Sequence, residues 1–79
     1  MKAIVIGKEF VSGHSKKTGK DFASNVVYVT HKKNGVDGQA VDTVWLDPAG
    51  YPFKDIHVGK TYDIDRDSRG YIVDFALVN

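Results

Sequence analysis

The 79-residue chain contains no cysteine, and it has only two prolines, one methionine and one tryptophan. Without cysteine, neither a disulfide bridge nor a thiolate metal site can stabilise so small a fold. A chain of this length forms one domain at most, which buries only about 60–65% of the surface that its unfolded form exposes. We therefore expect a single domain over residues 1–79 that gains further apolar burial by forming a homodimer.

Long hydrophobic runs are missing as well. No apolar stretch approaches the ~18 residues of a membrane span. The short run that follows Lys2 ends in Lys8 and Glu9, so it is too short for the core of a signal peptide. Together with the lack of cysteine, this predicts a cytoplasmic protein that does not interact with membranes.

The sequence has no recognisable group of catalytic or metal-binding residues. His14, His31 and His57 fall on three separate predicted loops or strand ends, without the spacing of helical metal ligands. The alternating aspartates of segment 63–67 resemble the start of a calcium loop, but its sixth position is Ser68 and not glycine. We expect these aspartates to line the solvent side of a strand. The sequence therefore predicts no enzyme, no metal site and no cofactor.

What the sequence does contain is a repeated strand pattern. Runs rich in Val, Ile, Thr, Tyr and Phe alternate with turns rich in Gly, Asn, Asp and Lys, and no window has an apolar repeat of 3.6 residues. The five predicted strands are Lys2–Val11, Asp21–His31, Gln39–Asp47, Lys60–Arg66 and Tyr71–Val78. Gly7 predicts a bulge in the first strand, whereas Gly13 is expected in the turn that follows it. Two prolines and a glycine predict a long third connection with one helical turn before Val58.

Five short antiparallel strands must curl or close to cover their faces and edges. We therefore expect an all-β protein, a five-stranded antiparallel OB-fold. This Greek-key barrel usually binds its ligand on strands two and three. An SH3-like barrel is the alternative with the same strands.

Positive charge is concentrated in the first half of the chain. Through Gly35 there are seven lysines against Glu9 and Asp21, a net charge of +5, whereas the remainder has four cations against eight aspartates, a net charge of −4. A basic region attracts phosphates, provided that this separation survives folding. The candidate phosphate contacts, on two turns and the last hairpin, are Lys16, Lys17, Lys20, Lys32, Lys33 and Arg69.

Aromatic residues accompany these lysines. In the second strand, Phe22 and Tyr28 share one face, and Val27 and Val29 share the other. Because the valines suit a tight interior, we expect the two aromatic rings to face solvent, where a stacked base contributes about 1–3 kcal/mol. The opposite orientation, with both rings in the core, is the alternative. Tyr71 beside the last turn is a further candidate.

Trp45, the single tryptophan, shares a strand face with Val41 and Thr43. It is either a stacking platform for a base or a residue of the core or of a subunit interface.

The order of these segments resembles the small single-stranded DNA-binding, helix-destabilising proteins of filamentous phages and related phage and plasmid replication proteins. The likeness covers nearly the whole chain. It lies in the basic loop of residues 15–22, Val44-Trp45-Leu46-Asp47 before a proline-containing connection, and segments 59–63 and 70–74. The resemblance implies an OB-fold, a two-fold homodimer and cooperative coating of single strands during replication, in the host cytoplasm for a phage-encoded protein.

By position in this family, the loop lysines would contact phosphates, Phe22 would stack on a base and Tyr28 would lie near a second base. The family's aromatic residue at the last hairpin is replaced by Ser68-Arg69-Gly70, so Arg69 or Tyr71 would take its role.

The predicted function is therefore sequence-independent binding of single-stranded DNA in phage or plasmid replication, through Lys–phosphate contacts and aromatic stacking. Two alternatives use the same sequence features. The acidic second half favours a small β-barrel that docks on a partner protein, and a single-stranded RNA-binding protein would need the same lysines and aromatics.

Overall fold

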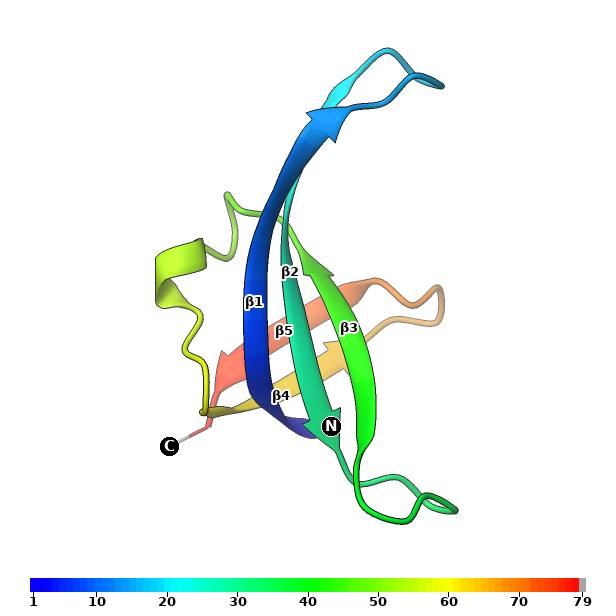
Figure 1. The fold of residues 1–79 in the computed structure, drawn as a ribbon, viewed down its shortest axis with the longest axis vertical. Coiled ribbons are helices and arrows are strands. Elements are labelled where there is room, and N and C mark those ends of the chain that lie inside the picture. The colour runs from blue at the N-terminus through cyan, green and yellow to red at the C-terminus, as the bar shows by residue number, and fades with distance from the viewer. Residues whose placement is uncertain (79) are drawn as a thin grey trace.

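The computed structural model describes residues 1–78, whose regular elements are five strands and one short 3-10 helix (Figure 1). They are β1 (Lys2–His14), β2 (Asp21–His31), β3 (Ala40–Leu46), η1 (Phe53–Asp55), β4 (Thr61–Arg66) and β5 (Ile72–Leu77). All strand pairs are antiparallel. The predicted all-β class, the five strands and the helical turn before Val58 are confirmed.

The strands form one sheet in the order β3-β2-β1-β4-β5. Strand β1 pairs with β2 along most of its length but with β4 only over residues 2–4. In Figure 1, β4 and β5 cross behind the other three strands. Within residues 1–78, β3 and β5 do not pair with each other. The sheet is therefore not closed, and the predicted OB-fold barrel is not confirmed.

Strand β1 is longer than predicted. It continues through Ser12 and Gly13 to His14, so the loop begins at Ser15, and Gly13 is a strand residue rather than a turn residue. The cause is pairing with β2 that is continuous from Gly7 onward and ends at the pair His14–Asp21. There the histidine Nδ1 lies 2.8 Å from the carboxylate.

Other local predictions are close to the structure. The register of β1 against β2 shifts between Val5 and Gly7, which is the bulge expected at this glycine. Strand β2 has its predicted bounds, and the ends of β3, β4 and β5 differ from prediction by no more than one residue.

The core lies between β4–β5 and the face of β1–β3 turned toward them, which we call the inner face. Its buried residues are Ala3, Val5, Val27, Val29, Val44, Leu46, Ile56, Tyr62, Ile64 and Phe75. The rings of Tyr62 and Phe75 stack with centroids 4.4 Å apart, and Tyr51 meets Phe75 edge-on at 5.9 Å. The inward orientation of Val27 and Val29 is thus confirmed. Strand β5 buries Phe75, but its neighbours Val73 and Leu77 are exposed.

Candidate nucleic-acid interface

The opposite side of β1–β3, the outer face, presents aromatic side chains to solvent. Side chains alternate along a strand, and cross-strand partners share a face. Phe22 and Tyr28 of β2 therefore lie on the outer face together with Trp45, the partner of Val26. Phe22 is 47% exposed and Trp45 is 59% exposed, whereas Tyr28 is half-buried. The predicted outward orientation of the two β2 rings is confirmed, and Trp45 is not a core residue.

Two glycines of β1 make room for the rings of β2. Gly13 lies opposite Phe22, and Gly7 lies opposite Tyr28. A Cβ atom on Gly13 would lie 3.0 Å from Cζ of Phe22, and one on Gly7 would lie 3.5 Å from Cδ2 of Tyr28. Each ring thus leans across the neighbouring strand instead of standing upright.

The hydroxyl of Tyr28 is held by a carboxylate on the same face. It donates a hydrogen bond to Oε2 of Glu9 over 3.2 Å. This bond, and the charge of the carboxylate, raise the pKa of Tyr28 above its ordinary value. Tyr28 therefore stays a neutral hydrogen-bond donor, with its ring fixed between Gly7 and Glu9.

The β1–β2 and β2–β3 loops lie at the two ends of these strands (Figure 1), and both loops contain lysines. Lys16, Lys17 and Lys20 are exposed in the β1–β2 loop, and Lys32 and Lys33 are exposed in the β2–β3 loop at the other end. The 11 residues of β2 separate the two loops; at about 3.3 Å per residue this is roughly 36 Å. The predicted phosphate-binding lysines therefore form two basic ends of one face and not a single patch.

The β1–β2 loop has a defined backbone. The N–H of Ser15 donates to the carbonyl of Lys20 over 2.9 Å, and the N–H of Gly19 donates to the carbonyl of Ser15 over 2.8 Å. Gly19 has a φ of 70°, a left-handed conformation that favours glycine. These backbone hydrogen bonds hold the loop in shape without a contribution from the lysine side chains.

Arg69 and Tyr71 lie elsewhere. Both are exposed in the β4–β5 hairpin, which projects from a different side of the sheet than the two basic loops (Figure 1). The Arg69 guanidinium lies 3.3 Å from Oδ2 of Asp67 and 5.1 Å from the centre of the Tyr71 ring. The structure does not bring these two predicted site residues together with the other seven.

Three of the eight aspartates of the second half, Asp63, Asp65 and Asp74, lie on β4 and β5. Asp65 is exposed on β4 opposite Asp74 of β5, while Tyr62 and Ile64 point into the core. The expected alternation of aspartates with core residues in β4 is confirmed. The charge separation along the chain survives folding only in part, because Asp42 lies on β3 and Asp37 lies in the β2–β3 loop together with its two lysines.

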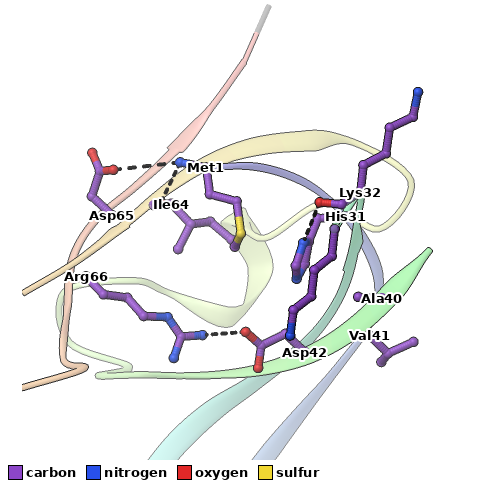
Figure 2. Close-up of a pocket in the computed structure, with 10 residues that line it drawn as sticks. Met1, His31, Lys32, Ala40, Val41, Asp42, Ile64, Asp65 and Arg66 are labelled. Carbon is purple, nitrogen blue, oxygen red and sulfur yellow. Dashed lines mark hydrogen bonds and ion pairs between the residues drawn. The ribbon is translucent and has the colours of Figure 1, made fainter. Parts of the chain in front are cut away.

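A groove of about 720 Å³ separates the free edge of β3 from β4, next to the second basic loop. Arg66 spans it, with Nη2 placed 3.1 Å from Oδ2 of Asp42, whose Oδ1 accepts the backbone N–H of Thr43 over 2.8 Å. Figure 2 shows this ion pair, with Lys32 directed away from the groove. Sequence reasoning missed the pair, because nothing local links residues 24 positions apart.

Among residues 1–78, no three His, Asp or Glu side chains are grouped closely enough to hold a metal ion. None of the helices in this part of the chain is long and apolar enough to span a membrane.

Comparison of the chain with protein-family models, with curated proteins and with solved structures found no match. The geometry described above is therefore what supports a function for this chain.

Proposed function

We propose that this protein binds single-stranded DNA along the outer face of β1–β3, largely independently of sequence. The observation that carries the proposal is the pair of rings, Phe22 and Tyr28, leaning over glycines on an exposed face between two lysine-bearing loops. A base stacked on such a ring contributes about 1–3 kcal/mol, whatever its identity. Trp45, on the same face and exposed, is a third platform that the candidate site gains from the structure.

The lysines supply the contacts to phosphate. Each neutralised phosphate releases condensed counterion, so the logarithm of the binding constant falls with the logarithm of salt concentration by about 0.7 per contact on a single strand. Engagement of Lys16, Lys17, Lys20, Lys32 and Lys33 together corresponds to a slope of about −3.5. The distance between the two loops favours a strand that runs along β2 from one end to the other.

The family resemblance belongs to the same proposal. The strand order is compatible with a partly open Greek-key barrel of the OB type in which the edges of β3 and β5 stand apart. A role in phage or plasmid replication, a cytoplasmic location and a homodimer follow from that resemblance. The unpaired β5 edge, with Val73 and Leu77 exposed, supports the dimer, because such an edge favours pairing with another chain.

Trp45 offers a direct test. We expect its fluorescence to be quenched by oligo-dT at micromolar protein and low salt, and the quenching to be reversed by added salt. Lys16→Glu with Lys17→Glu should abolish it. The matched control is Lys54→Glu with Lys60→Glu, which makes the same charge change at exposed positions outside the two basic loops. Equal loss of binding in both double variants, or no quenching of the native protein, would contradict the proposal.

Competition between oligo-dT and oligo-rU distinguishes a DNA-binding from an RNA-binding protein. Stronger displacement by the RNA would identify single-stranded RNA as the ligand. RNA recognition uses the same stacking and adds contacts to the 2′-hydroxyl.

A protein-interaction module is the second candidate. The free edge of β3 and the groove beside it favour it, because an extended peptide adds readily to an unpaired strand. Under this alternative the Lys16→Glu and Lys17→Glu changes would leave partner capture intact.

A further inference from the structure

Glu9 is the single acidic residue that the register of β1, β2 and β3 assigns to the outer face. It lies opposite Val26, which in turn lies opposite Trp45, so these three form a row across the strands. Val26 is only 3% exposed although it is on the outer face, so its neighbours close over it. Along β1, Glu9 lies between Gly7 and Gly13, the partners of Tyr28 and Phe22, so the carboxylate stands on the β1 side of the aromatic surface, between the rows of these two rings.

A carboxylate at this position weakens the binding of phosphate. Like charges repel, and phosphate has no hydrogen-bond donor to offer. This repulsion is offset only when the carboxylate accepts hydrogen bonds from the ligand. In a nucleic acid, the hydrogen-bond donors are on the edges of the bases. A base stacked on Tyr28 brings such an edge toward Glu9, since Tyr28 lies on the neighbouring strand one row away and its hydroxyl contacts the carboxylate.

The carboxylate has room for a ligand. Tyr28 occupies one position on Oε2, at 3.2 Å, and leaves Oε1 without a contact from this hydroxyl. An ionised carboxylate offers about four lone-pair sites on its two oxygens. The tyrosine bond fixes the direction of the group but does not saturate it.

Guanine is the base that fits best. Its N1–H and N2–H point the same way and match the two oxygens of a carboxylate, whereas thymine has one imino donor and adenine and cytosine each have one amino group. Paired, charge-assisted hydrogen bonds are stronger and more selective than single ones.

We infer that Glu9 recognises guanine through paired hydrogen bonds to N1–H and N2–H, giving the single-strand site a base preference. The inference rests on the proposed function, because it assigns a ligand group to a residue of the same face.

The test compares four single-stranded 12-mers, (TTG)4, (TTI)4, (TTA)4 and T12, by quenching of Trp45. Inosine lacks the N2 amino group and so removes one of the two hydrogen bonds. We expect the native protein to bind (TTG)4 about fivefold to tenfold more tightly than T12, with the inosine strand close to T12. In Glu9→Gln the four strands should bind within about twofold of one another.

Two controls separate charge from recognition. Asp74→Asn removes one negative charge from β5 and should preserve the guanine preference. Asp65→Asn makes the same charge change at an exposed position of β4 and should preserve the preference as well. If Glu9→Gln does not fold, the comparison of guanine with inosine in the native protein decides alone.

Equal affinity of the native protein for all four strands would overturn the inference and leave the proposed binding of single strands standing. Failure of every strand to bind would instead contradict the proposed function, and the inference with it.

Discussion

At the scale of single residues, the aromatic surface depends on what lies opposite each ring. Phe22 and Tyr28 would stand upright on an ordinary sheet, but each faces a glycine of β1 and leans across it. An aromatic side chain on the neighbouring strand that covers a strand glycine is a known way of stabilising such positions. The glycines are thus part of the candidate site although they cannot contact a ligand through a side chain.

Gly13→Ala tests this arrangement. Its Cβ would lie 3.0 Å from Cζ and 3.1 Å from Cε1 of Phe22, so the ring must move away from the strand. We expect oligo-dT affinity to fall by about 1 kcal/mol, the lower bound for losing one stacked base, as measured by quenching of Trp45. Gly50→Ala is the control, because its Cβ would meet nothing closer than 3.9 Å. Unchanged affinity in Gly13→Ala would show that the position of Phe22 is irrelevant to binding.

The Tyr28–Glu9 hydrogen bond predicts a pH effect. It raises the pKa of Tyr28, so its contribution to stability is complete below the ordinary tyrosine value of 10.0 and is lost as the pH rises through the folded-state pKa. We expect Glu9→Gln to lower the pKa of Tyr28. Ultraviolet titration of tyrosinate checks this, with Tyr28→Phe identifying the Tyr28 contribution. A titration curve unchanged by Glu9→Gln would disprove the coupling.

Alternation along β2 was enough to predict which side chains of that strand face outward. Val27 and Val29 share one face and are suited to a tight interior, so the side chains on the other face point to solvent. The contacts of those side chains could not be predicted in the same way. They depend on the register of β1 against β2, which a bulge at Gly7 shifts and which only the assembled sheet reveals.

At the scale of secondary-structure elements, one of the side chains of β3 caps a single backbone N–H of that strand. Asp42 accepts the N–H of Thr43, which therefore is not offered to another strand, and it also binds Arg66 of β4. Exposed edges promote aggregation unless they are blocked in some such way.

Asp42→Ala removes both interactions. The hydrogen bond and the partly exposed ion pair together stabilise the fold by about 1 kcal/mol, so we expect a comparable loss in the free energy of unfolding by urea. The variant should also self-associate at high concentration, as judged by size-exclusion chromatography. Asp37→Ala removes the same charge from the exposed β2–β3 loop, and it should neither lower the free energy of unfolding nor self-associate. An Asp42→Ala variant that elutes at the same size as the native protein at every concentration would disprove the protective role.

Strand identities were predictable from local composition, since each run of branched and aromatic residues became a strand. The end of β1 was not predictable in this way. Ser12, Gly13 and His14 have little strand propensity of their own and are extended because β2 pairs with them. The failure of the sheet to close also lies beyond local pattern, because it depends on how far β3 stands from β5.

At the scale of the whole molecule, the fold is more extended than its length requires. The radius of gyration is 13.7 Å, against about 11.6 Å for a compact domain of this length. The β1–β2 hairpin accounts for the difference, since it projects from the body and bears the first basic loop at its tip (Figure 1).

The tip should therefore be separable from the fold. Replacing residues 15–20 by Asn-Gly retains a two-residue hairpin turn and removes no buried apolar residue. We expect the thermal midpoint to change by less than about 4 °C, the shift produced by roughly 1 kcal/mol in a domain of this size, while oligo-dT affinity falls at least tenfold. Circular dichroism and Trp45 quenching measure the two quantities. A large drop in the thermal midpoint would show instead that the loop supports the core.

The short pairing of β1 with β4 divides the sheet mechanically. Three ladder pairs join the β1–β3 half to the β4–β5 half, and they are flanked by backbone hydrogen bonds at Val5 and Met1. A ligand held by both basic loops contacts the β1–β3 half only. We expect amide hydrogen exchange to slow in β1–β3 on binding and to stay unchanged in β4–β5, so that the second half remains available for contacts of its own while the first is occupied.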